Sequence, residues 1–233
     1  MDFEKTGIPG LDEILKGGFR RNSSVIVKGG PGTGKTIFAL QFIVEGAKKG
    51  QPGLFISAEE ELEDFREYAK SLGINLEKYE KQKLVYLVKQ PITLKKLISI
   101  SVPLELIRSK KVKRVVLDSL TLFKYGVESE LGYRKEVLDL ITNLRGVLFL
   151  ATAEETNSSI DDLESAAEDY LFDGIVRLAK IREGNVVERA LYISKMRGQD
   201  HMINIFPFNI KKNGLEVYPK EIPFNLVKKE FKK

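Results

Sequence analysis

The residues best suited to chemistry form a glycine-rich run, Gly29-Gly30-Pro31-Gly32-Thr33-Gly34-Lys35-Thr36. This run matches the P-loop pattern G-x-x-x-x-G-K-[ST] at every specified position. Its glycines let backbone N–H groups turn inward around phosphate oxygens, and a helix that follows adds a favourable dipole. We predict that Lys35 reaches the β- and γ-phosphates and that Thr36 gives a hydroxyl to Mg²⁺. The predicted nucleotide contacts are Gly30, Pro31, Gly32, Thr33, Gly34, Lys35 and Thr36.

Asp118 is the candidate second ligand for that Mg²⁺. It follows the apolar run Val115-Val116-Leu117, which is typical of a buried strand. Taken alone, an aspartate at the end of a strand is more often a turn residue. Because this one follows a P-loop at this distance along the chain, we interpret it as the carboxylate that holds a Mg²⁺-bound water opposite the loop.

Glu59 and Glu60 are candidates for activating water. They follow a second apolar run, Leu54 to Ser57. Paired carboxylates at the C-terminal end of a strand can polarise the water that attacks a phosphoryl group. The alternative is that they begin the acidic first turn of a helix, where the helix dipole favours negative charge. The residue types alone leave the two interpretations about equal.

Short apolar runs and helix-like segments alternate along the chain and would position these residues. The P-loop lies between a predicted strand, Ser24–Val27, and a predicted helix from about Lys35 to Lys49, the context that its motif requires. A second helix is predicted from about Glu61 to Leu72. The other predicted strands are Leu54–Ser57, Leu84–Leu87, Val115–Leu117 and Val147–Leu150, then segments near Gly174–Leu178, Arg189–Ser194, Ile205–Ile210 and Leu215–Tyr218. This order predicts an α/β fold with a mainly parallel sheet flanked by helices and antiparallel strands at the C-terminal end.

Composition narrows the class of protein. The 233 residues fit one large domain, predicted over residues 1–219, with a basic tail over 220–233. There is no cysteine and one histidine, His201, which excludes disulfides and thiolate chemistry and argues against a histidine metal site. No apolar run approaches the roughly 18 residues of a membrane helix, and the N-terminus lacks a signal peptide. The sequence therefore predicts a cytoplasmic protein with no membrane association.

Four motifs, in order, resemble the KaiC/RadA branch of the RecA superfamily. They are residues 6–18, ahead of the P-loop, then Ser57-Ala58-Glu59-Glu60, Asp118-Ser119, and Lys195-Met196-Arg197-Gly198-Gln199-Asp200-His201, which resembles the K-x-R-G-x-x-H segment of KaiC-like proteins. The similarity extends from about residue 5 to about residue 219. It implies a RecA-like P-loop core that uses ATP and Mg²⁺, with Glu59 and Glu60 as catalytic glutamates.

The last motif implies a ring. In that family, the lysine and arginine of this segment reach the γ-phosphate held by a neighbouring subunit. By resemblance, Lys195 and Arg197 act in trans as catalytic fingers within a homo-oligomeric ring, usually a hexamer. Such a finger is typically worth about 10³ to 10⁵ in rate. The alternative is a charged strand end at the surface. Thr152, after the strand near Leu148, is a further candidate for sensing the γ-phosphate.

Two positions depart from the family pattern. Asn22 and Ser23 stand where the family usually has glycine before the first strand, although Asn tolerates the same positive φ. KaiC-like chains often place an aspartate after Pro207-Phe208 that helps seat the base, and here that position falls at Lys212. Base selectivity is therefore open.

Two functions fit these observations. The first is a KaiC-like ATPase that acts as a nucleotide-dependent oligomeric switch. The second is a RadA-paralogue DNA-repair accessory protein that binds single-stranded DNA without strand exchange. Lysine and arginine neutralise a nucleic-acid backbone, but the candidate loop 151–173 holds eight acidic residues and no basic one. DNA binding would instead use the tail or the basic cluster 108–114, which is expected to be a surface turn.

Overall fold

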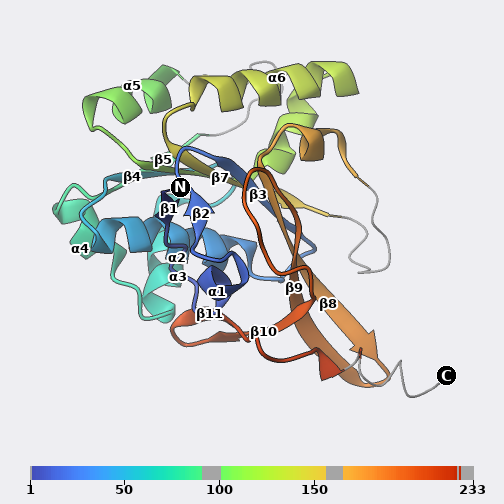
Figure 1. Ribbon diagram of the computed structural model, residues 1–233. Helices are drawn as coiled ribbons and strands as arrows, with labels where there is room; N and C mark the ends of the chain where they lie inside the picture. The colour runs from blue at the N-terminus through green and yellow to red at the C-terminus, as the bar shows by residue number, and fades with distance from the viewer. Residues whose placement is uncertain (1, 91–100, 156–164, 225, 227–233) are drawn as a thin grey trace.

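The computed structural model describes residues 2–90, 101–155, 165–224 and 226. A large sheet runs through the middle of the molecule with helices on both faces (Figure 1). The helices are α1 Leu11–Ile14, α2 Lys35–Lys48, α3 Leu62–Ser71, α4 Leu76–Lys81, α5 Ser101–Ser109 and α6 Glu130–Asn143, with 3-10 helices η1 Leu120–Gly126 and η2 Ala167–Tyr170. The strands are β1 Phe3–Glu4, β2 Phe19–Arg20, β3 Ser24–Gly29, β4 Gly53–Ser57, β5 Val85–Lys89, β6 Arg114–Asp118, β7 Leu148–Glu154, β8 Gly174–Glu183, β9 Val186–Met196, β10 Phe206–Lys211 and β11 Gly214–Val217.

The sheet has nine strands in the order β11-β10-β9-β8-β3-β7-β6-β4-β5. The strands from β8 to β5 in this order pair in parallel. β9, β10 and β11 continue the sheet by antiparallel pairing. β3, β4 and β6 are buried almost throughout, which agrees with apolar runs that do not alternate. The predicted α/β fold with an antiparallel C-terminal end is confirmed.

Two hydrophobic clusters fill the two faces of the sheet. One joins the apolar sides of α1, α2, α3 and α4 to the sheet and includes Phe38 and Phe42 of α2. The other joins α6 and η1 to the opposite face and includes Tyr133 and Val137 of α6. The two helix layers are visible above and below the strands in Figure 1. The two helix layers bury both faces of the sheet and so position the residues at the carboxyl ends of its strands.

Strand register brings those carboxyl ends together. Ser57 of β4 pairs with Asp118 of β6. Gly29 of β3, the first residue of the P-loop motif, pairs with Glu154 of β7. The carboxyl ends of these four neighbouring strands therefore meet on one side of the sheet, which we call the carboxyl edge.

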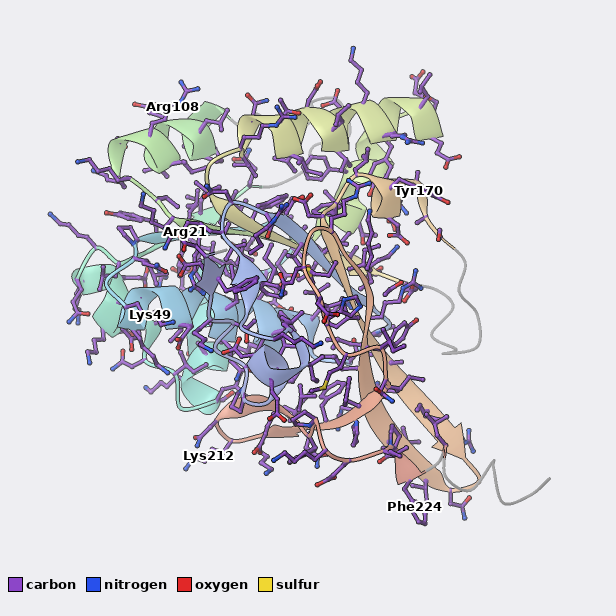
Figure 2. All side chains as sticks on the ribbon, viewed as in Figure 1. Arg21, Lys49, Arg108, Tyr170, Lys212 and Phe224 are labelled. Atoms are coloured by element: carbon purple, nitrogen blue, oxygen red, sulfur yellow. The ribbon has the colours of Figure 1, made fainter. Side chains whose placement is uncertain are left out.

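One local prediction is wrong. Arg114, assigned to a surface turn with Arg108 and the lysines between them, begins β6 and is only 1% exposed. Its guanidinium lies 3.4 Å from a carboxylate oxygen of Glu4, because a buried charge requires a partner. Arg108 is exposed on α5, as expected (Figure 2). Asn22 has a φ of 59°, which confirms the positive value predicted for it.

Parts of the DNA-binding prediction lie outside the described residues. These are 156–164 of the candidate acidic loop and 225 and 227–233 of the tail. None of the helices in the described part of the chain combines the length and apolarity needed to cross a bilayer.

Candidate nucleotide-binding site

The P-loop connects β3 to α2 at the centre of the sheet. Gly32 and Gly34 have φ values of 65° and 104°, in the left-handed region where a side chain would introduce strain. The ammonium group of Lys35 donates hydrogen bonds to the carbonyls of Gly29 and Gly30 at 2.9 and 3.1 Å. Lys35 also begins α2, a helix of 14 residues, so the loop combines a cation with the positive end of a helix dipole.

A pocket of about 180 Å³ opens beside this loop. It is lined by Pro31, Gly32, Lys35, Thr36, Phe55, Ser57, Glu59, Glu60, Phe65, Asp118, Ser119 and Glu154. The pocket therefore unites the P-loop with Asp118 and with both candidate glutamates, which follow three different strands. These residues are far apart in the sequence, and they come together because their strands are neighbours in the sheet.

Asp118 lies where a metal-bound water could be held. Its carboxylate accepts hydrogen bonds from the hydroxyls of Thr152 and Thr36. Burial raises the pKa of Asp118, while the two hydroxyls and the charge of Lys35 act in the opposite direction. The donors are one carboxylate and one hydroxyl, hard oxygen ligands of the kind that Mg²⁺ accepts beside phosphates. Thr36 and Asp118 fit Mg²⁺, and the fully buried Thr152 fits a role in orienting Asp118 better than direct contact with phosphate.

Glu59 and Glu60 lie in the turn between β4 and α3. α3 begins at Leu62 with Glu61 as its N-cap, so the interpretation that both glutamates belong to its first turn is wrong. The hydroxyl of Ser119 donates to Glu59 Oε1 at 2.9 Å. Partial removal from water raises the pKa of Glu60, and the negative charges of nearby acidic residues raise it further. The two carboxylates therefore have different environments within one pocket.

Lys35 lies among the carboxylates of this pocket. Burial lowers the pKa of its ammonium group, and the charges of Glu154, Asp118 and Glu59 counteract that effect. A cation that is partly removed from water and surrounded by acidic groups is well suited to hold a polyanion together with a divalent metal.

Sequence reasoning missed three residues of this site. Ser119 belongs to the Asp118-Ser119 motif, but nothing in the sequence predicts that its hydroxyl donates a hydrogen bond to Glu59. Glu154 ends β7 and lines the pocket. The ammonium of Lys180, on β8, donates to the carbonyl of Pro31 at 2.9 Å. Lys180 could have been found only by knowing that β8 pairs with β3.

The structure separates Lys195 and Arg197 from the P-loop of the same chain. β9 runs antiparallel to β8, so Lys195 pairs with Ile175, near the beginning of β8. The P-loop instead follows the end of β3, where Gly29 pairs with Leu178. Lys195 and Arg197 lie toward the opposite edge of the sheet, the amino edge. Along β8, the partner of Lys195 lies three residues, or about 10 Å, before the partner of Gly29. This agrees with the expectation that they do not border their own phosphate site.

Lys195 and Arg197 make defined contacts with η2. Lys195 Nζ donates to the carbonyl of Asp169 at 2.7 Å, and Arg197 Nη2 donates to the carbonyl of Tyr170 at 2.9 Å. Burial and the nearby charge of Arg197 lower the pKa of Lys195. Both cations are thus held at the surface of η2 by neutral acceptors.

Comparison with known proteins agrees with this geometry. A family model described as the KaiC ATPase matches residues 4–222. The chain belongs to the KaiC ATPase family. The match covers all four sequence motifs and every candidate residue of the pocket, and it confirms the resemblance to the KaiC/RadA branch.

Several members of the KaiC family resemble the chain over nearly its whole length. A UPF0273 protein of Thermotoga maritima is 31% identical over 239 residues, covering 93% of this chain and 96% of that protein. The circadian clock oscillator protein KaiC of Parasynechococcus marenigrum is 33% identical over 226 residues, which are 92% of this chain and 44% of that protein. The crystal structure of a KaiC-like protein from Pyrococcus horikoshii OT3 superposes with a TM-score of 0.80 at 32% identity, covering 94% of this chain and 99% of that one.

Proposed function

We propose that this KaiC family protein binds ATP with Mg²⁺, hydrolyses it to ADP and phosphate, and acts as a nucleotide-dependent switch in a homo-oligomeric ring of six. The observation that carries the proposal is the pocket beside the P-loop, which unites Lys35, Thr36, Asp118 and the two glutamates. An ordinary glycine turn would not require carboxylates from two neighbouring strands at the same place.

Each group has a chemical task in this proposal. Lys35 and the backbone N–H groups of the P-loop bind the β- and γ-phosphates. Thr36 and Asp118 would hold Mg²⁺, which supplies charge neutralisation between the phosphates. Glu59 accepts a proton from water as the water oxygen bonds to the γ-phosphorus and the bond to the β-phosphate oxygen breaks. ADP leaves with the electrons of that bond.

The environments of the two glutamates support separate roles. The hydrogen bond from the Ser119 hydroxyl orients the carboxylate of Glu59 within the pocket, as the positioning of an attacking water requires. Glu60, whose pKa is raised, is less suited to remain charged. We assign water activation to Glu59 and a supporting electrostatic role to Glu60.

The position of Lys195 and Arg197 supports a ring. A charge that develops on the γ-phosphate needs cations opposite the P-loop, and these two residues lie too far along the sheet to provide them in the same chain. A neighbouring protomer can provide them, since the planar fork of an arginine matches phosphate oxygens well. The assembly must then be head-to-tail, because each protomer both offers and receives a pair of fingers, and a head-to-tail assembly whose rotation closes forms a ring.

The first test is ATPase turnover combined with the mass of the assembly in solution. We expect Mg²⁺-dependent release of phosphate, and a ring that forms or is stabilised with a non-hydrolysable ATP analogue. A protein that stays monomeric both without nucleotide and with each nucleotide tested, yet still hydrolyses ATP, would contradict the ring. The same assay with single-stranded DNA tests the accessory-protein alternative: stimulation by DNA and strongly salt-dependent binding would favour it over the switch.

A further inference from the structure

A cluster of buried charges lies next to the P-loop strand, on the sheet face that carries α6. Lys28 of β3 and Arg177 of β8 are register partners, so their side chains leave the sheet on the same face. Both residues are almost fully buried, at 2% and 3% exposed. Two neighbouring cations in such surroundings require carboxylates in direct contact.

Asp169 of η2 joins these two cations. Its Oδ1 accepts a hydrogen bond from Lys28 Nζ at 2.7 Å, and its Oδ2 accepts one from Arg177 Nη2 at 3.1 Å. Oδ2 also accepts from the backbone N–H of Ala166 at 3.2 Å, at the start of η2. One carboxylate therefore fixes this short helix to both strands.

Two other carboxylates share the charge of the cluster. Glu168 lies 3.5 Å from Lys28, and Glu155 lies 2.5 Å from Arg177. Lys28 and Arg177 would therefore each keep one acidic partner if Asp169 were neutralised. The distinctive feature of Asp169 is that it contacts both strands at once.

The same short helix holds the fingers. The backbone carbonyl of Asp169 is the acceptor for Lys195 Nζ, and the next carbonyl, of Tyr170, is the acceptor for Arg197 Nη2. Tyr170 is 59% exposed and lies on the outer side of η2 (Figure 2), so this end of η2 lies at the surface of the protomer. The position of η2 therefore sets the position of both finger side chains.

We propose that Asp169 is a positioning residue for catalysis in the neighbouring protomer, because it anchors η2 to the P-loop strand and so aims Lys195 and Arg197. This inference rests on the proposed function of these two residues in trans. Lys28 directly precedes Gly29, whose carbonyl accepts the Lys35 hydrogen bond. A continuous set of contacts thus joins the nucleotide site of a protomer to the two residues that it contributes to the site of its neighbour.

The test uses mixed rings in which each protomer has one task. Acceptor protomers carry Lys195→Ala and Arg197→Ala, so they bind ATP but offer no fingers. Donor protomers carry Lys35→Ala, so they offer fingers but bind no ATP. Asp169→Asn is added to the donor in one mixture and to the acceptor in another. Glu168→Gln in the donor is the matched control, because Glu168 is a buried carboxylate of the same helix that also contacts Lys28 but whose backbone carbonyl holds neither finger.

We expect the plain donor to restore turnover and the Glu168→Gln donor to match it within about twofold. The Asp169→Asn donor should restore about 10- to 100-fold less, because a small misplacement of catalytic groups has effects of that size. Asp169→Asn in the acceptor should change turnover much less. Equal losses from donor and acceptor, or full restoration by the Asp169→Asn donor, would overturn the positioning role. Failure of the plain donor would instead overturn the trans assignment of the proposed function, and the inference with it.

A second donor variant covers the case in which Asp169→Asn does not enter rings. Lys28→Met removes the strand anchor of Asp169 but leaves its bond to Arg177. In a donor that already lacks Lys35, damage to its own P-loop has no consequence for the measurement. Restoration by this donor should fall about tenfold, and restoration equal to that of the plain donor would contradict the anchor.

Discussion

In the proposed function, the carboxyl edge and the amino edge of the same sheet carry complementary halves of a catalytic apparatus. At the carboxyl edge, the cation Lys35 lies among acidic side chains within one pocket. Toward the amino edge, the cations Lys195 and Arg197 bond to backbone carbonyls of η2. In the part of the chain that the structure describes, neither of these two forms an ion pair. The pocket at one edge is lined by acidic side chains around Lys35, and the other edge carries two cations whose hydrogen bonds go to backbone carbonyls.

This difference shows which half of the site is complete within a chain. The proposal assigns phosphate binding, metal binding and water activation to the carboxyl edge, so a single protomer is expected to bind nucleotide. It assigns neutralisation of the transition-state charge to the amino edge, where it is expected only between protomers. Binding and turnover should therefore respond differently to changes at the two edges.

The largest effect should come from Lys35→Ala at the carboxyl edge. Without this ammonium, the charge of the β- and γ-phosphates meets no cation of the P-loop, and tight ATP binding should be lost together with turnover. Calorimetry or fluorescence titration with an ATP analogue measures the affinity. Near-normal affinity and turnover in this variant would remove the pocket as the nucleotide site.

Glu59→Gln should separate binding from chemistry at the same edge. An amide cannot accept a proton from water, so hydrolysis should slow by about 10²- to 10⁴-fold while ATP affinity stays close to that of the unchanged protein. Single-turnover kinetics with saturating ATP isolates the chemical step. The comparison with Glu60→Gln sharpens the assignment, since equal and small losses from both would argue that neither glutamate activates water.

Glu60→Gln should have the smallest effect on turnover, about tenfold or less, and a distinctive effect on stability. The pKa of Glu60 is raised in the folded protein, so its ionised form destabilises the fold at pH values above that pKa. This destabilisation disappears below the ordinary pKa of 4.5, where the carboxyl group is protonated in both the folded and the unfolded chain. The variant should therefore melt at a higher temperature near pH 7 and lose this advantage as the pH falls toward 4. Thermal melts of both proteins across this range measure it, and a lower melting temperature at pH 7 would contradict the raised pKa.

Much of the carboxyl edge could be predicted from sequence because its signals are local. The P-loop is a continuous motif, and Asp118 and Glu59 each end an apolar run. Lys180 and Ser119 could not be assigned in this way, since their contacts with the P-loop and with Glu59 depend on which strands pair. The burial of Arg114 could not be predicted either, because its partner Glu4 lies near the N-terminus, 110 positions away in the sequence.

The amino edge depended on resemblance rather than on local chemistry. Nothing in the residue types around Lys195 distinguishes a catalytic finger from a charged strand end. The structure adds that this strand end is held by η2 and that η2 is anchored by Asp169 to the P-loop strand. The contact between Lys195 and Asp169 spans 26 positions and that between Lys28 and Asp169 spans 141, and no sequence periodicity reveals either of them.

The most direct test of the composite site varies the ratio of two inactive variants in one ring. Lys35→Ala protomers supply fingers, and protomers with Lys195→Ala and Arg197→Ala supply a working P-loop. If the two edges act together across an interface, activity should rise from near zero in either pure variant to a maximum at equal amounts. Random head-to-tail assembly then pairs a working pocket with intact fingers at about one quarter of interfaces, so the maximum should be about one quarter of the unmutated activity. Turnover that stays at the level of the pure variants at every ratio, with subunit exchange demonstrated by mass spectrometry, would contradict the account.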